Sequence, residues 1–522
     1  MITWLSGFYI FAQDIETLNH LTSKTMAAAN AANFEVIVPE DDLQTLDTFA
    51  RCLPMAFRPE MDHKIQKRGR LSWDSHATRL LPFFCRGRGT PNPGMMFFSR
   101  DGEPIQFDPL GEDRQKNAHV LMLGPTGSGK TATLVSLLLH TMAVHKPRLF
   151  LVTALPTFYL LADYFESQGL TVNKVQITPQ NSPSLPPFAD ITKLVALDND
   201  ELLASERDIL GEAEISARLM ITGGDPEEER RLHKEDKALI KSAIMLAANT
   251  VVEEGRTQAL TQDIAIAMRA MASDTENYNE AQRNSLTNRA SVIDSYTTGF
   301  DGEVFNRTGE AWKEADITIV ELGLFARKGY EDKLAIAMAG LMSTINNVVE
   351  AAQFSGRNTI TVIDEAHILV KNPLIGPYLN SIIAMWRTFG GWLWLATQNL
   401  SQFPDTAREL LNQPEWWICL NTDEDEVTQI SRFKELNAEQ QGLLKAARKE
   451  SGKFTEGVVM SKNIMTLFRN VPPALALALA QTESHEKAHR RNVMELNDVS
   501  ELEAATLIAQ EINDKRKKHR GL

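Results

Sequence analysis

The stretch from Gly124 to Thr131, GPTGSGKT, restricts the fold of this 522-residue chain more than any other. An apolar run, residues 118–123, precedes it, and a helix-forming run, residues 132–139, follows it. A strand, a glycine-rich turn and a helix start form the setting of a phosphate-binding P-loop, whose backbone N–H groups converge on anionic oxygens. The pattern predicts a nucleoside triphosphate site made by Gly124, Pro125, Thr126, Gly127, Ser128, Gly129, Lys130, Thr131 and Ala132.

Two side chains of this loop are expected to carry chemistry. Lys130 is expected to reach the β- and γ-phosphates, and the Thr131 hydroxyl is expected to bind Mg²⁺. The alternative interpretation is a glycine-rich surface turn. Both flanks are those of a P-loop, so the nucleotide interpretation is favoured.

A second motif, at residues 360–367, is an apolar run that ends in Asp364 and Glu365. We expect Asp364 to orient Mg²⁺ and Glu365 to polarise the water that attacks the γ-phosphate. Adjacent carboxylates also occur by chance at strand ends, but the P-loop upstream favours the catalytic interpretation. His367 follows as either a reporter of the nucleotide state or a structural histidine.

The third candidate is Gln398, which follows the apolar run 392–397. A polar side chain at the tip of this strand is placed to contact the γ-phosphate or the attacking water, although it can also simply cap a loop. Hydrolysis further benefits from an arginine, often supplied by a neighbouring subunit. The sequence offers three downstream candidates without choosing among them: Arg387, Arg432 and Arg448.

Continuous apolar runs separated by helical patterns predict a mostly parallel sheet covered on both faces. Strands are expected at residues 148–152, 172–177, 317–322, 359–364 and 392–397, with a further apolar run at 416–421. Residues 97–107 resemble a hairpin that turns at Asp101-Gly102. From about 190 to 300 the pattern is helical, and Asp225-Pro226 begins one of its helices.

The predicted fold class is α/β: a P-loop nucleotide-binding core on a mostly parallel sheet, with an all-helical insertion and a small α+β N-terminal segment. The expected divisions are residues 1–110 for a partial N-terminal or linker region, 111–480 for the ATPase domain, and 481–522 for a charged helical tail. The insertion is expected at about 190–300. The opening apolar run, residues 1–12, fits a buried strand.

Composition bears mainly on partners and compartment. A formal net charge of −14 argues against broad electrostatic capture of nucleic acid, though it leaves room for a local basic channel. Basic clusters at 64–70 and 515–520 are expected to be a solvated face and a disordered tail. Three scattered cysteines predict a reducing compartment. No stretch approaches the roughly 18 apolar residues of a membrane span, so a cytoplasmic chain is expected.

Several runs together resemble the conjugative-transfer and type IV secretion ATPases, the TraC/TrbE-like proteins related to the fourth VirB component. The runs are GPTGSGKT, TVIDEAH, WRTFGG at 386–391 and ATQNLSQF at 396–403. Weaker agreement comes from LTSKTMAAANAANF with LPMAF, from GGDPEEE, and from GKFTEGVVMS at 452–461. The nucleotide motifs alone fit any RecA/HerA-like motor, and the auxiliary runs narrow the resemblance, which covers nearly the whole chain.

The resemblance implies a RecA/HerA-like P-loop ATPase core that binds ATP and Mg²⁺. It further implies a homo-oligomer, with a hexamer expected, that docks beneath a secretion channel at the cytoplasmic face of the inner membrane. It implies that Lys130 and Thr131 hold phosphate and Mg²⁺, that Asp364 and Glu365 serve the metal and the water, and that Gln398 senses the γ-phosphate. DNA remains a possible partner.

The chain departs from this family in two respects. Members usually carry a long N-terminal domain before the region where this sequence begins, so a shortened form or a fragment is expected. The strand after the P-loop helix ends in Thr153-Ala154, where relatives tend to place an acidic residue. Two other functions stay open: a DNA translocase of the HerA, FtsK or coupling-protein kind, and a scaffold that binds ATP with little turnover.

Overall fold

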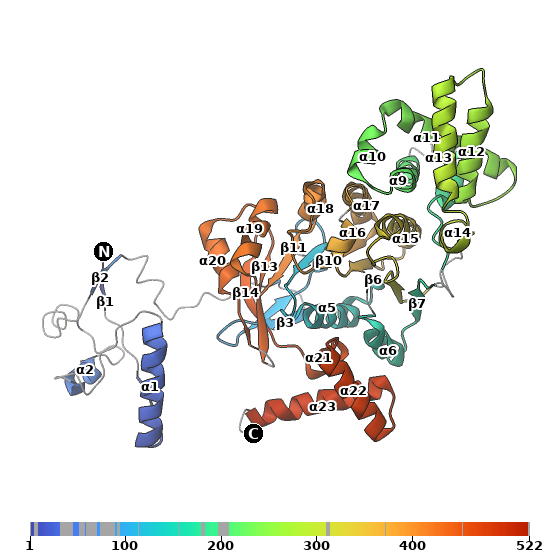
Figure 1. The fold of residues 1–522 in the computed structure, drawn as a ribbon. Helices are drawn as coiled ribbons and strands as arrows, with labels where there is room; N and C mark the ends of the chain where they lie inside the picture. The colour runs from blue at the N-terminus through green and yellow to red at the C-terminus, as the bar shows by residue number, and fades with distance from the viewer. Residues whose placement is uncertain are drawn as a thin grey trace. The chain divides into compact units, whose positions relative to one another are not determined.

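The computed structural model describes residues 2–4, 9–31, 45–51, 58, 70–73, 89–90, 94–112, 114–154, 156–178, 183–196, 208–309, 314–370, 372–450 and 453–519 (Figure 1). The chain divides into two compact units, residues 1–86 and 87–522. In the first unit, β1 (Ile2–Trp4) pairs antiparallel with β2 (Arg70–Ser72). Two helices lie between these strands in the sequence, α1 (Ile15–Ala31) and α2 (Thr45–Arg51). Residues 1 and 5–8 of the opening run, and all but Arg70 of the basic cluster at 64–70, lie outside the described residues.

The second unit is built on one large sheet, with 12 strands among the residues that the structure describes. Its order is β4-β3-β14-β13-β11-β5-β10-β9-β6-β8-β7, and β12 pairs with β13. The strands from β11 to β7 in this order run parallel to one another. They are β11 (Trp416–Leu420), β5 (Val120–Leu123), β10 (Gly391–Thr397), β9 (Thr359–Ile363), β6 (Arg148–Thr153), β8 (Ile317–Glu321) and β7 (Val172–Gln176).

The other end of the sheet is antiparallel. It consists of β13 (Phe454–Met460), β14 (Met465–Asn470), β3 (Met95–Phe98), β4 (Pro104–Phe107) and the short β12 (Lys449–Glu450). The hairpin expected at 97–107 is β3–β4, and its turn is closed by a hydrogen bond from the Gly102 N–H to the Ser99 carbonyl. The five predicted parallel strands are confirmed, and the run at 416–421 forms β11.

Helices cover both faces of the sheet (Figure 1). One face carries α5 (Lys130–His145), α6 (Tyr159–Ser167) and three C-terminal helices, α21 (Ala474–Leu479), α22 (Ser484–Asn497) and α23 (Glu501–His519). There, alternate residues of β5, Val120 and Met122, join one core with Leu134 of α5 and Ile508 of α23. The basic end of the chain is helical as far as His519, where a disordered tail was expected, because α23 packs on α21 and α6.

The opposite face carries α15 (Glu331–Ala352), α16 (Ala366–Val370), α17 (Ile375–Phe389) and α18 (Arg408–Asn412). Leu121 and Leu123, the other residues of β5, join a second core with these helices. Two further helices follow β11, α19 (Glu424–Phe433) and α20 (Ala438–Ala446). The short α7 (Lys193–Ala196) follows β7. Within the described residues, α15 is the one helix long and apolar enough to cross a membrane, and 72% of its most apolar window is buried in the fold.

The predicted helical insertion is confirmed between β7 and β8. It comprises α9 (Ile209–Thr222), α10 (Pro226–Arg231), α11 (Lys234–Glu253), α12 (Thr261–Ser273), α13 (Glu280–Asp294) and α14 (Gly299–Phe305). Asp225 caps α10 by accepting hydrogen bonds from the N–H groups of Glu227 and Glu228, with Pro226 at the first position. This helix start was predicted from the sequence.

Candidate active site

The P-loop joins the end of β5 at Leu123 to the start of α5 at Lys130. Gly127 and Gly129 have φ of 77° and 91°, in the left-handed region that favours glycine. A Cβ atom on Gly129 would lie 2.7 Å from the Thr455 hydroxyl oxygen, and one on Gly124 would lie 2.5 Å from the Ser128 hydroxyl oxygen. The loop therefore needs glycine both for its curl and for its close packing.

The order of the sheet brings the three sequence motifs to one edge. Strand β10 lies between β5 and β9, and all three run parallel. Their carboxyl ends therefore meet, which places the P-loop, Gln398 and the Asp364-Glu365 pair side by side. The Gly124 N–H donates to the Thr397 carbonyl at 3.1 Å, and this bond ties the P-loop directly to the end of β10.

Side chains from these segments form one hydrogen-bonded network. The Lys130 Nζ pairs with Asp364 Oδ1 at 3.2 Å and with Glu365 Oε1 at 2.8 Å. The Gln398 Nε2 donates to the same Glu365 oxygen at 2.9 Å, and Thr126 Oγ1 donates to Gln398 Oε1 at 2.7 Å. The structure thus brings together four of the predicted site residues, with Thr126 of the loop as a fifth member.

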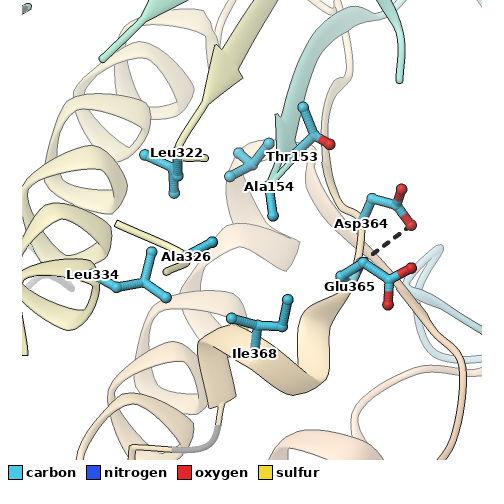
Figure 2. Close-up of a pocket in the computed structure, with 9 residues that line it drawn as sticks. Thr153, Ala154, Leu322, Ala326, Leu334, Asp364, Glu365 and Ile368 are labelled. Atoms are coloured by element: carbon cyan, nitrogen blue, oxygen red, sulfur yellow. Dashed lines mark hydrogen bonds between the residues drawn. The ribbon is translucent and has the colours of Figure 1, made fainter. Parts of the chain in front are cut away.

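The backbone at Glu365 is unusual. Its φ of 56° places a non-glycine residue in the left-handed region, a conformation that costs about 1–2 kcal/mol. Its N–H donates to Asp364 Oδ1 at 3.1 Å, and the two carboxylates stand at the polar rim of a small pocket (Figure 2). Apolar side chains line the rest of that pocket, among them Leu322, Leu334 and Ile368. Such strain is typical of functional sites that the surrounding fold holds in place.

The two carboxylates differ in their electrostatics. Burial raises the pKa of Asp364, and the nearby Lys130 charge only partly offsets this. Burial acts on Glu365 in the same direction, but the Lys130 charge and the hydrogen bond from Gln398 together bring its pKa below the usual range. Glu365 is the more accessible of the two and is ionised at neutral pH. It therefore has the charge required of a general base.

His367 lies beside this network. Burial lowers the pKa of its imidazole, although the Glu365 charge acts in the opposite direction. Its Nδ1 lies 3.3 Å from Glu365 Oε2 and 3.3 Å from the Thr397 hydroxyl oxygen. The ring therefore bridges the ends of β9 and β10.

The candidate arginines lie apart from the network. Arg387 is exposed on α17, and Arg432 on α19 pairs with Asp405 at 2.6 Å. Arg448 is exposed just before β12. Among the contacts described for these residues, none joins an arginine to Lys130 or Glu365 of the same chain. This arrangement leaves each of the three as a candidate for action on a neighbouring subunit.

The donor atoms fit a Mg²⁺ ion that enters together with a nucleotide. Thr131, the second residue of α5, supplies a hydroxyl, and Asp364, directly after β9, supplies a carboxylate, so both offer the oxygen ligands that Mg²⁺ prefers. The Ser128 hydroxyl is buried without a hydrogen-bond partner, as expected of a cradle that lacks its phosphate. Among the described residues there is no group of three or more His, Cys, Asp or Glu side chains suited to a resident metal.

Some neighbours of the site gave no signal in the sequence. Lys449 donates to the Gly127 carbonyl from β12, and Thr455 packs on Gly129 from β13. Both residues follow the P-loop by more than 300 positions in a stretch without a catalytic motif. Only the pairing of the antiparallel strands places them here.

The fold and this constellation define a P-loop nucleotide-binding domain with a RecA-like parallel sheet. Among solved structures, VirB4 of Thermoanaerobacter pseudethanolicus shares the fold, with a TM-score of 0.57 and 16% identity over 77% of this chain and 99% of that one. The plasmid coupling protein TrwB, in complex with the non-hydrolysable GTP analogue GDPNP, gives a TM-score of 0.46 at 12% identity, over 68% of this chain and 85% of that one. No protein-family model and no curated protein matches the sequence.

Proposed function

We propose that this chain is the ATP-hydrolysing motor of a conjugative type IV secretion apparatus. The observation that carries the proposal is the network of Lys130, Asp364, Glu365 and Gln398. It stands on a fold shared with nearly the whole solved VirB4 chain. The sequence runs that resemble the conjugative-transfer ATPases add support.

The geometry supports an in-line attack of water on the γ-phosphate. The P-loop N–H groups and Lys130 bind the triphosphate, so Lys130 exchanges its contacts with the carboxylates for phosphate oxygens. Glu365, freed from this pairing, accepts the proton of the attacking water. Gln398 lies between the P-loop and Glu365 and is placed to orient that water. Mg²⁺, held by Thr131 and Asp364, would neutralise the charge that develops on the phosphates.

The proposal extends to assembly and location. We propose a hexameric homo-oligomer in which Arg387, Arg432 or Arg448 of one subunit completes the site of the next. We further propose that it docks onto other channel components at the cytoplasmic face of the inner membrane. A DNA translocase is the second candidate, because the P-loop and Asp-Glu motifs alone fit any RecA/HerA-like motor. The acidic net charge of −14 disfavours it.

The test is the steady-state ATPase rate as a function of protein concentration, with and without single-stranded DNA. A motor that requires a neighbouring subunit gives a specific rate that rises with concentration, and Lys130→Ala abolishes the rate. Strong stimulation by DNA that weakens with salt would instead indicate the translocase. Nucleotide binding without hydrolysis at any concentration would indicate the scaffold.

A further inference from the structure

A second cavity, of about 420 Å³, lies in the antiparallel end of the sheet. It is formed by the β3–β4 turn together with β12, β13 and β14, and it contains none of the network residues described above. Its lining combines four basic side chains with one aromatic residue, one exposed carboxylate and one buried carboxylate: Arg100, Arg448, Lys449, Glu450, Phe454, Glu456 and Arg469.

This cavity adjoins the P-loop. The Lys449 Nζ donates to the Gly127 carbonyl, which links the cavity to the P-loop. Thr455 packs against Gly129 from one face of β13, and Phe454 and Glu456 project from the opposite face of the same strand. The catalytic carboxylates lie on the opposite side of the P-loop strand, because β9 and β10 flank β5 on one side while β11 and β13 follow it on the other. A triphosphate whose γ end meets Lys130 and Glu365 therefore directs its nucleoside end toward this cavity.

The aromatic side chain is part of a rigid stack. The Arg469 guanidinium carbon lies 4.2 Å from the centre of the Phe454 ring. Arg469 Nε also donates to Glu456 Oε1 at 2.9 Å. Arg100 donates to the same carboxylate twice, from Nε to Oε1 at 3.0 Å and from Nη2 to Oε2 at 2.7 Å. Glu456 is 1% exposed and accepts the Arg448 N–H at 3.0 Å as well. One buried carboxylate thus fixes both guanidinium groups and orients the one that stacks on Phe454.

We propose that this cavity holds the base and ribose of the bound nucleotide, with the base stacked against the Phe454–Arg469 pair. The inference rests on the proposed function, since it requires a triphosphate in the P-loop. Aromatic rings and guanidinium planes stack on any base, and purines offer more area than pyrimidines. Two carboxylates line the cavity and both are already engaged: two arginines occupy Glu456, and Lys453 pairs with Glu450. The site therefore selects purines by stacking and distinguishes adenine from guanine weakly.

The test compares ATP with inorganic tripolyphosphate, which fills the P-loop but has no base. Binding of both to the full chain is measured by calorimetry with Mg²⁺, for the wild type, Phe454→Ala, Phe454→Leu and Phe454→Trp. We expect Phe454→Ala and Phe454→Leu to weaken ATP about 5- to 100-fold, the range that loss of one base–aromatic stack gives. Phe454→Trp should retain ATP. Tripolyphosphate should bind all four proteins alike, which also shows that the variants are folded.

In the wild type, GTP should bind within about threefold of ATP, and CTP should bind more weakly, because stacking area decides the order. Equal weakening of ATP and tripolyphosphate by Phe454→Leu would overturn the inference, since Phe454 would then merely support the P-loop. Unchanged ATP binding, or loss of single-stranded DNA binding alone, would also overturn it. If the wild type binds tripolyphosphate as tightly as ATP, the base adds no affinity, which would overturn this inference alone. If the wild type binds neither ligand, the proposed function would be overturned too.

Discussion

Replacing Glu365 by glutamine changes the charge of the proposed general base and little else. Glutamine has the same length and keeps an oxygen to accept the hydrogen bonds from Lys130 at 2.8 Å and Gln398 at 2.9 Å. Because it is not glycine either, it meets the same strain at φ 56°. The substitution therefore isolates proton transfer from geometry.

The expected magnitude follows from the role. General base catalysis contributes about 10²- to 10⁴-fold, so kcat for ATP should fall by that factor, equivalent to about 2.7–5.5 kcal/mol in the barrier. The substitution also lowers folding stability, because the buried Lys130 charge then faces a single carboxylate, that of Asp364. ATP affinity should be unchanged or higher, since one negative charge near the phosphates is gone.

The assay is steady-state phosphate release at saturating Mg²⁺-ATP, with nucleotide affinity measured in parallel. Glu435→Gln is the matched control, because it makes the same chemical change at an exposed residue after α19 and should leave kcat unchanged. A kcat for Glu365→Gln within about threefold of the wild type would refute the reasoning. In that case the water would be activated by another group, and the network around Lys130 would serve binding alone.

Three further predictions test the loop, the sensor and the basic cavity. Gly129→Ala should weaken ATP binding at least tenfold, because the new Cβ would meet Thr455. At Gly127 a new Cβ has no atom within 4 Å, so Gly127→Ala should cost only about 1–2 kcal/mol of backbone strain. Equal weakening of ATP binding by the two substitutions, measured by calorimetry, would contradict this prediction. Gln398→Ala should lower kcat about 10- to 100-fold with nucleotide affinity within about threefold, as expected from the loss of one water-orienting group; a change in affinity alone would make Gln398 a binding residue. Burial would raise the pKa of Glu456, but hydrogen bonds from two arginines hold it below the usual range, so the folded state binds this proton more weakly than the unfolded chain. Its stabilising contribution should be complete above about pH 5 and should fall as the pH drops through the folded pKa; urea unfolding should therefore show a steeper acid loss for the wild type than for Glu456→Gln.

The parallel half of the sheet could be predicted because its strands are continuously apolar and end in diagnostic residues. Parallel strands meet at their carboxyl ends, so the motifs around Lys130, Asp364 and Gln398 had to lie near one another once a single sheet was assumed. From the sequence, Gln398 was assigned to a strand beside the one that ends at Asp364-Glu365. The position of β10 between β5 and β9 was not predicted beyond this. The helical insertion was predictable as well, because its caps and apolar faces are local features.

In the antiparallel half, only the β3–β4 hairpin could be predicted, from its Asp101-Gly102 turn. Glu456 joins Arg100 across 356 residues, and a charged residue in a strand ordinarily indicates a solvent-facing side. Partner choice among β13, β14 and β3 is set by packing of the whole sheet, and pairwise sequence patterns do not encode it. The same limit applies to the arginines: the sequence could not show that Arg432 is tied to Asp405.

The place of β5 in the sheet has a consequence for the synthesis of this chain. Its direct neighbours in the sheet are β10 and β11, which are synthesised much later. Gln398 follows its partner Thr126 by 272 residues, and Asp364 follows its partner Lys130 by 234 residues. While the ribosome is making the helical insertion, the insertion can fold through local contacts, but the apolar P-loop strand has no partner. A nascent chain that ends before residue 391 therefore lacks both neighbours of β5 and leaves both edges of this apolar strand unpaired.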